Sequence, residues 1–440
     1  MANFHRCKYV LCVLVSCLLL SVAHSQDRVT TLAVRVRHVF IIVFENKNFE
    51  DTFITSKQDP YLRETLLTQG VLLTQYYGTG HASLDNYISL LSGQSPTPDT
   101  ANDCVPNPTA SAGNFNDVKE TGVTSDGQVI ADSGCVYGNH VKTLPDQLTS
   151  AGLQWKGYME DMGNDPMRES ITCGHPPLGV ATDLTNSAEP PSYAVPLGDA
   201  YTTRHNPFMY FHSVIDSASC KARVVNLARL SSDLRYKSTT PNLVFITPNL
   251  CHDGHDGDGT GTAGKTCANG EPGGLTSADS FLRVWVPRIM RSPAYKADGL
   301  LIITFDEGNY AFSESKNADT GQSVLDVTFE GEACCDQRPG PNLRGIRPGT
   351  RTLLSTPERM TRLVVRGYGG DRVGALLLSP FVRAGSASSS PYNHYSLLRS
   401  LEDIFGLHEH LGYAADNPSE GYYVQALWND QGVFKSRVKH

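Results

Sequence analysis

Several kinds of segment are missing from this chain of 440 residues, and each absence removes a class of function. There is no sustained run of basic residues and the formal net charge is −8, so nucleic acid is not expected as a main partner. No Gly-x-Ser-x-Gly elbow of a serine esterase occurs. A sulfatase segment of the form Cys/Ser-x-Pro-x-Arg is absent, since the nearest match, at 104–108, ends in proline. No Asn-x-Ser/Thr site lacks an intervening proline, so N-glycosylation is not expected.

Long hydrophobic runs are also scarce, and the one at the N-terminus has the character of an export signal. Arg6 and Lys8 precede the apolar run Val10–Val22, and small residues follow at 23 and 25. The run has 13 residues, which is short for a membrane span, so an uncleaved anchor is the weaker interpretation. We therefore predict a signal peptide at 1–25 and a soluble, secreted mature protein without a transmembrane segment.

The cysteines agree with export. Eight of the eleven lie beyond the signal, and an even number in an exported chain predicts disulfides. Their spacing is not that of a zinc ribbon. Cys334 and Cys335 are adjacent, and because a ring closed by neighbouring cysteines is strained, we expect each to bond to a more distant partner.

Short apolar runs alternate with helical patterns along the chain, which predicts an α/β fold with a mostly parallel central sheet flanked by helices. The expected strands are 38–44, 71–76, 153–158, 243–247, 300–305 and 374–378. The expected helices are 60–69, 84–91, 143–150, 277–290 and 395–405. The segments 93–140, 160–240 and 308–370 are rich in Gly, Pro, Asn and Ser and carry six of the eight mature cysteines, so they are interpreted as insertions pinned by disulfides.

Acidic and histidine side chains follow three of the expected strands. In open α/β sheets ligands bind at the carboxyl ends of the strands, so these groups are expected to converge. Each pair alone is more typical of a turn or helix cap. Together they are oxygen and imidazole donors suited to a divalent metal ion. The proposed ligands are Glu45, Asn46, Asp253, Asp306 and Glu307, and His255 is a further candidate.

Ser83 stands where the glycine-containing stretch YGTGHA gives way to the apolar helix at 84–91. A serine at this place is usually an N-cap. A helix start also favours a phosphate, and a nearby metal makes a serine hydroxyl a usable nucleophile. His81 and Asn86 lie close enough in sequence to hold phosphoryl oxygens.

Five segments in order resemble one known family: HVFIIVFENKNFEDTF, GHASLDNYISLLSG, TPNLCHDGHD, ITFDEG and YNHYSLLRSLEDIFGL. They are similar to the phosphoesterase family of acid phosphatases and non-specific phospholipases C, in the alkaline phosphatase superfamily. The likeness is greatest to secreted mycobacterial-type acid phosphatases that act on phosphatidylinositol 3-phosphate. The resemblance spans about 37–410, which predicts a catalytic domain there and a C-terminal extension at 411–440.

The resemblance implies a secreted metal-dependent acid phosphatase that hydrolyses phosphate monoesters, phosphoinositides among them, through a phosphoseryl intermediate. It places the nucleophile at Ser83, with Thr79 as the competing candidate. Asp253, His255 and His394 match positions near the metal or phosphate, and His255 or His394 is expected to protonate the leaving group. A phospholipase C-type phosphodiesterase and a non-catalytic binding protein on the same fold are the alternatives.

Overall fold

The computed structural model describes residues 36–105, 113–183, 185, 198–343, 348–418, 421–427, 430 and 433–434. The expected signal peptide at 1–25 lies outside these residues. Within them, no helix is both long enough and apolar enough to cross a bilayer.

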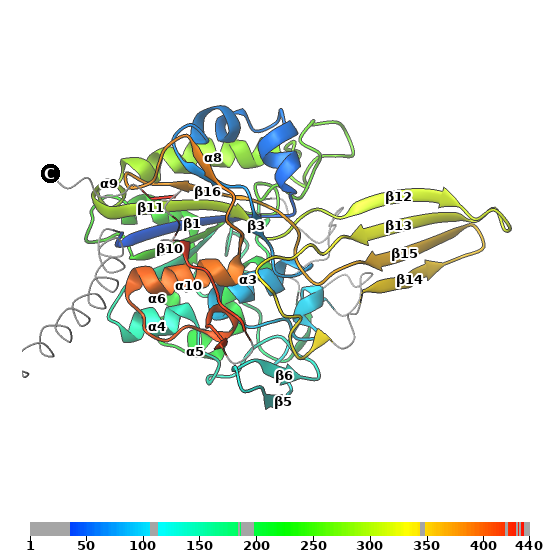
Figure 1. The fold of residues 1–440 in the computed structure, drawn as a ribbon, viewed down its shortest axis with the longest axis horizontal. Helices are drawn as coiled ribbons and strands as arrows, with labels where there is room; N and C mark the ends of the chain where they lie inside the picture. The colour runs from blue at the N-terminus through cyan, green and yellow to red at the C-terminus, as the bar shows by residue number, and fades with distance from the viewer. Residues whose placement is uncertain are drawn as a thin grey trace, which may run out of the picture.

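An eight-stranded sheet forms the centre of the molecule (Figure 1). Its order is β17-β2-β16-β11-β1-β10-β7-β9. The bounds are β17 Ser386–Ser388, β2 Val71–Leu73, β16 Ala375–Leu378, β11 Gly299–Phe305, β1 His38–Phe44, β10 Leu243–Thr247, β7 Trp155–Met159 and β9 Val224–Asn226. The strands β11, β1, β10, β7 and β9 are parallel, and every residue of β1, β10 and β11 is buried. The predicted α/β class is therefore confirmed. The expected strand at 374–378 runs against β11, because it returns directly from the projecting sheet described below.

Helices cover both faces of this sheet (Figure 1). On one face, α8 (Gly274–Arg291) packs against α9 (Pro293–Asp298) and the π-helix η2 (Tyr61–Leu66). On the other, α10 (His394–Phe405) packs against α3 (Ser83–Ser92) and α4 (Leu144–Ser150). The shorter elements are η1 Glu50–Thr55, η3 Thr100–Asn102, η4 Thr203–His205, η5 Pro207–Tyr210, α5 His212–Ile215, α6 Cys220–Arg223, η6 Leu227–Arg229, α7 Leu230–Asp233 and η8 Gly412–Ala414.

The insertion at 308–370 has a structure of its own. It forms a four-stranded sheet in the order β12-β13-β15-β14 that projects from the body (Figure 1). The bounds are β12 Ala311–Lys316, β13 Ser323–Phe329, β14 Gly349–Ser355 and β15 Arg359–Val365. Three two-stranded pairs complete the strands: β3 Tyr76–Tyr77 with β18 Tyr392–Asn393, β4 Gly113–Phe115 with β8 Val180–Asp183, and β5 Glu120–Val123 with β6 Val129–Ala131.

All eight cysteines among the described residues form disulfides, as predicted. The pairs are Cys104–Cys135, Cys173–Cys220, Cys251–Cys267 and Cys334–Cys335. The expectation that Cys334 and Cys335 bond to distant partners is wrong. The other six cysteines of the described part of the chain pair among themselves, and a left-handed backbone at Cys335, with φ 66°, accompanies the closed pair.

The described residues beyond 410 pack on the main body of the molecule. Tyr413 N donates to Gly93 O at 2.9 Å, and Leu427 N donates to Ser400 Oγ at 2.9 Å. Val382 and Phe434 form an antiparallel bridge. Those parts of the predicted C-terminal extension are therefore integral to the domain.

Candidate active site

The predicted polar groups meet at the carboxyl ends of β1 and β11. Phe44 and Phe305 are register partners, so Glu45 and Asp306 leave the sheet at the same level. Asn46 adopts φ 40°, which turns the chain at once and brings both members of the pair to the same place. Asn46 N donates to Asp306 Oδ1 at 3.0 Å, and Asn46 Nδ2 donates to Glu307 Oε1 at 2.7 Å. Neighbouring side chains thus reach one cluster because the strands have already ended.

The strand β10 adds Asp253 to this cluster. Glu45 N donates to the carbonyl oxygen of Asp253 at 2.8 Å. His205, from the 160–240 insertion, lies between the two side chains: its Nε2 is 3.4 Å from Glu45 Oε2 and its Nδ1 is 3.6 Å from Asp253 Oδ2. All three side chains are buried, so the imidazole separates two carboxylates that would otherwise repel each other.

Ser83 reaches the same cluster from the first turn of α3. Ala82 is the N-cap in an extended conformation, so Ser83 is the first helical residue and its hydroxyl is not used as a cap. Ser83 Oγ donates to Glu45 Oε2 at 2.7 Å. One turn later on the same helix face, Tyr87 Oη donates to Glu45 Oε1 at 2.5 Å. The competing candidate, Thr79, instead donates its hydroxyl to Asn86 Oδ1 at 3.2 Å.

His81 is held by two carboxylates. Its Nδ1 lies 3.3 Å from Glu307 Oε2 and its Nε2 lies 3.1 Å from Asp371 Oδ2, while its ring stacks on Phe329 with centroids 4.5 Å apart. Burial opposes a charge on this ring, but the contacts with Asp371 and Glu307 outweigh burial and raise the pKa of His81 to about 10. His81 is therefore a cation next to the site.

The remaining predicted residues surround the cluster. Asn86 is occupied in shaping the preceding loop: its Oδ1 accepts from Thr79 N at 2.7 Å and from Gly80 N at 3.1 Å. His394 is also engaged at both nitrogens, with Nε2 2.6 Å from Asp306 O and Nδ1 2.9 Å from Tyr76 Oη. These contacts favour positioning roles for Asn86 and His394. His255 Nε2 lies 3.1 Å from Tyr310 Oη, and the backbone N of His255 donates to Asp253 Oδ1 at 2.9 Å.

Three acidic side chains of the cluster are buried close to other acids, and this raises their pKa values. Burial, and then the charge of Asp306, raise the pKa of Glu45. Burial, and then Glu307, raise the pKa of Asp306, while burial and Glu45 raise that of Asp253. A cation placed among these acids would relieve the repulsion.

The donor set fits a divalent metal ion. It consists of carboxylate and amide oxygens with an imidazole nearby, and Asn46 Oδ1 and Asp306 Oδ2 are buried without a hydrogen-bond partner in the described part of the chain. Among the described residues, no three His, Cys, Asp or Glu side chains already converge on one point as the ligands of a bound ion do. Ser83, Tyr87 and Asn46 occupy several of the acidic oxygens instead.

A cavity of about 440 Å³ opens beside this cluster. Its lining includes Lys47 and His255 from the strand ends, and Tyr310 and Phe312 from the base of the projecting sheet. A smaller cavity of about 80 Å³ lies next to His81 and Phe329. The two cavities thus combine polar side chains with aromatic ones, and Ser83 lines neither of them.

Three residues of the site were missed from the sequence: Tyr87, His205 and Asp371. Tyr87 had a usable signal, because it follows Ser83 by four positions on one helix face. His205 lies in the 160–240 insertion and Asp371 lies directly after the 308–370 insertion, where no periodic pattern indicates which side chains turn inward.

The chain has recognisable relatives. It is 23% identical over 268 residues to a phosphate-repressible acid phosphatase of Penicillium chrysogenum, a match that covers 61% of this chain and 47% of that protein. The chain thus spans about half the length of that relative. It is 22% identical over 397 residues to a phosphatidylinositol-3-phosphatase of Mycobacterium tuberculosis, covering 89% of this chain and 83% of the relative.

Among solved structures, an alkaline phosphatase superfamily protein from Vibrio parahaemolyticus matches with a TM-score of 0.43 and 11% identity, covering 86% of this chain and 68% of that one. The model of the Phosphoesterase family matches residues 54–408, a stretch that includes Ser83, Asp253, Asp306 and His394. The chain therefore belongs to the Phosphoesterase family.

Proposed function

We propose that this protein is an exported, metal-dependent acid phosphatase that hydrolyses phosphate monoesters through a phosphoserine at Ser83. One observation carries the proposal: the Ser83 hydroxyl donates to Glu45 at 2.7 Å inside a buried acidic cluster at the carboxyl end of the sheet. The acid phosphatases and the phosphatidylinositol-3-phosphatase among its relatives support this substrate class, with phosphoinositides as candidates. The disulfides support export.

Glu45, Asn46, Asp306 and Glu307 are the residues that would hold the metal ion, with Asp253 beside them. When bound, a divalent ion supplies positive charge that lowers the pKa of a nearby hydroxyl and offsets the charge of the phosphoryl oxygens. Asn46 orients both acids after β11 through its backbone and side-chain donors. Tyr87 and His205 fix the carboxylate of Glu45.

The reaction proceeds in two displacements. Ser83 Oγ attacks phosphorus, its proton directed toward Glu45 Oε2; the Oγ–P bond forms and the ester O–P bond breaks. His255, which lines the neighbouring cavity, gives a proton to the departing alkoxide. Water then attacks the phosphoserine, which releases inorganic phosphate and restores the hydroxyl. The imidazolium of His81 lies close enough to the cluster to balance phosphate charge.

Replacing the nucleophile tests this assignment. Ser83→Ala is expected to lower kcat for p-nitrophenyl phosphate by several orders of magnitude, since removal of the serine nucleophile of a protease lowers kcat by about 10⁶-fold. Thermal unfolding should remain near that of the wild type. Acid quenching of wild type with labelled substrate should trap phosphate on Ser83. Thr79→Ala is the matched control, because its hydroxyl lies on Asn86. A dead Thr79→Ala with an active Ser83→Ala would transfer the nucleophile to Thr79.

A substrate panel separates the alternatives. A monoesterase releases inorganic phosphate from p-nitrophenyl phosphate and from phosphoinositides. A phospholipase C-type enzyme releases a phosphorylated head group from phosphatidylcholine. A protein that does neither, with or without added divalent metal, would be the non-catalytic binding protein.

A further inference from the structure

A large cavity lies away from the acidic cluster. It has a volume of about 840 Å³, which is within the size range of small-molecule sites. Gln154, Trp155 and Lys156 line it from the start of β7, and the segment 238–241 lines it just before β10. The acidic cluster follows the opposite ends of the parallel strands, and a seven-residue strand such as β1 is roughly 20 Å long. The cavity is therefore separate from the candidate active site.

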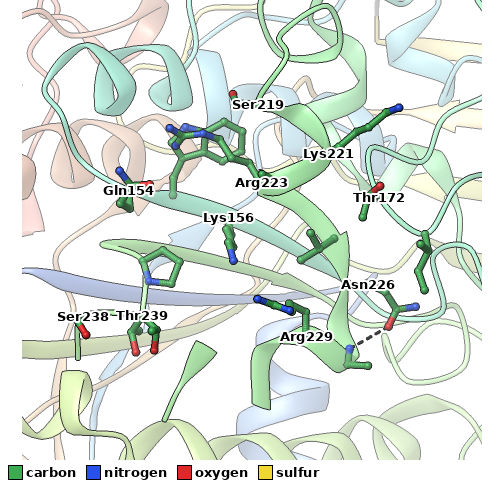
Figure 2. A pocket seen from close by; sticks show the side chains of 17 residues that line it. Gln154, Lys156, Thr172, Ser219, Lys221, Arg223, Asn226, Arg229, Ser238 and Thr239 are labelled. Carbon is green, nitrogen blue, oxygen red and sulfur yellow. Dashed lines mark hydrogen bonds between the residues drawn. The ribbon is translucent and has the colours of Figure 1, made fainter. Parts of the chain in front are cut away.

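The charge of this cavity is opposite to that of the whole chain. Its lining holds four cationic side chains, Lys156, Lys221, Arg223 and Arg229, and no acidic one among the described lining residues. Figure 2 shows Lys156, Arg223 and Arg229 grouped around the middle of the cavity, with Lys221 at its rim. In a chain whose formal net charge is −8, such a cluster creates a local positive potential.

One carboxylate lies behind the lining and fixes two of these cations. Asp233 Oδ2 accepts from Lys156 Nζ at 2.6 Å and from Tyr158 Oη at 2.8 Å, and Asp233 Oδ1 accepts from Arg229 Nε at 3.3 Å. Asp233 is buried and contributes one negative charge. The cavity thus keeps a net charge of three positive units when its four cations are counted against Asp233.

The side chain of Arg223 is held in place at the cavity by an aromatic ring. Its guanidinium lies over the Trp155 ring, 5.2 Å from the centroid, and Trp155 in turn stacks on Phe208. Arg223 Nη1 is buried and has no hydrogen-bond partner in the described part of the chain. A planar guanidinium held flat against a ring has the fixed geometry with which arginine binds the oxygens of a phosphate group. Arg223 and Lys221 belong to α6, whose first residue is Cys220. A disulfide joins Cys220 to Cys173, which is next in the chain to the lining residue Thr172.

We propose that this cavity is a second anion-binding site, which binds a small molecule or head group carrying two or more phosphate groups. Arg223 supplies the directed donors, Lys221, Lys156 and Arg229 supply charge, and the hydroxyls of Thr172 and Ser238 lie within the same lining. More than one phosphate is required, because a single one leaves most of the volume and charge unmatched. The site does not depend on the catalytic assignment.

Isothermal titration of the full chain with methylenediphosphonate, which phosphatases do not hydrolyse, tests the site. Wild type should bind one equivalent outside the catalytic cluster, with an affinity that falls as NaCl is raised. Arg223→Ala should weaken binding at least about tenfold, the effect of losing a charge-assisted hydrogen bond. Arg223→Lys keeps the charge and should lie between the two. Arg235→Ala removes an exposed cation outside the cavity and should bind within twofold of wild type.

Two further measurements decide the location and the source of the ligand. Asp306→Ala should keep diphosphonate binding, and Arg223→Ala should keep hydrolysis of p-nitrophenyl phosphate. Cosedimentation with vesicles containing a bisphosphorylated phosphoinositide, lost in Arg223→Ala, would identify a lipid head group; binding of the free diphosphonate alone would identify a soluble ligand. The proposal is overturned by equal binding in Arg223→Ala and Arg235→Ala, by loss of binding in Asp306→Ala, or by no saturable binding of either probe.

Discussion

Glu45 is the residue through which most of the candidate site is connected. Ser83 and Tyr87 donate to its two oxygens, His205 lies 3.4 Å away, and its backbone N bonds to Asp253. These contacts come from three parts of the chain: helix α3, the 160–240 insertion and the segment that follows β10. A change at Glu45 therefore alters the nucleophile and the proposed metal ligands together.

Metal content tests this connection. Asp306→Ala and Glu45→Ala should each lose bound metal and activity, and the double variant should be little worse than either one, because each removes a ligand from the same site. Glu50→Ala is the control, since Glu50 is exposed and pairs with Arg372. The measurement is elemental analysis per mole of protein. Full occupancy together with high activity in Asp306→Ala would contradict the metal site.

His394 should make the folded state sensitive to acid. Burial lowers its pKa from 6.5 to about 4, although the bond to the Asp306 carbonyl opposes the change. A group whose folded pKa is lowered contributes stability above the unfolded pKa and loses it as the pH falls through the folded pKa. Between pH 6.5 and 4, wild type should therefore lose on the order of 3 kcal/mol more unfolding free energy than His394→Gln. Urea titrations at several pH values measure the difference; parallel curves would refute it.

At the scale of elements, α3 and α10 end in the same way, with a left-handed glycine, but the two glycines have different surroundings. Each helix is followed by a glycine with φ 69°, Gly93 after α3 and Gly406 after α10. A Cβ at Gly93 would lie 2.2 Å from the carbonyl oxygen of Leu411, whereas at Gly406 no atom lies within 4 Å. The first turn of α3 carries Ser83. At its other end, the carbonyl oxygen of Gly93 accepts a hydrogen bond from Tyr413 N, which holds the chain beyond 410. The end of this helix is therefore coupled to the packing of the C-terminal segment.

The two glycines provide a matched pair of variants. Gly406→Ala should cost about 1 kcal/mol of unfolding free energy, the cost of a left-handed backbone for alanine. Gly93→Ala should cost about 1–3 kcal/mol more, because the methyl group meets backbone that cannot move freely. Urea denaturation of the two variants gives the comparison. Equal losses of unfolding free energy in the two variants would mean that the C-terminal segment moves away from the added methyl group without a cost in stability.

At the scale of the whole molecule, the disulfides divide by location. Cys104–Cys135 and Cys173–Cys220 each close a loop inside one insertion, with sequence separations of 31 and 47 residues. Cys251–Cys267 closes the 16-residue segment that follows β10 and carries Asp253 and His255. Each of these two insertions is thus cross-linked internally, and the described part of the central sheet contains no disulfide.

Thiol titration of the unfolded, unreduced protein should therefore find no free thiol among the eight mature cysteines. Reduction should lower the thermal midpoint, since each long-loop disulfide contributes about 2–4 kcal/mol. Loss of the Cys173–Cys220 bond in a Cys173→Ser, Cys220→Ser variant should lower the midpoint while metal content and activity stay near those of the wild type. Most cysteines titrating as free thiols would contradict the disulfide pattern.

The sequence by itself determined the framework of this protein. The strands 38–44 and 243–247 were predicted with the observed bounds, because continuous apolar runs end sharply at polar residues and only a buried strand accommodates them. The five predicted helices lie where their apolar periodicity placed them. The polar residues that follow the predicted strands also indicated which acidic side chains gather around Glu45. Such features depend on near neighbours in the chain, which a sequence displays directly.

Only the tertiary structure decided the rest. The reversed direction of β16 and the approach of His205 and Asp371 to the site depend on segments far apart in the chain. The vicinal pair Cys334–Cys335 joins neighbouring residues, but it follows from how the other six described cysteines pair over longer separations. His205 contacts Glu45 although the two residues are 160 positions apart in the chain, with no local pattern to indicate the contact. Contacts of this kind are selected by packing and by the pairing of buried charge, which exist only after the chain has folded.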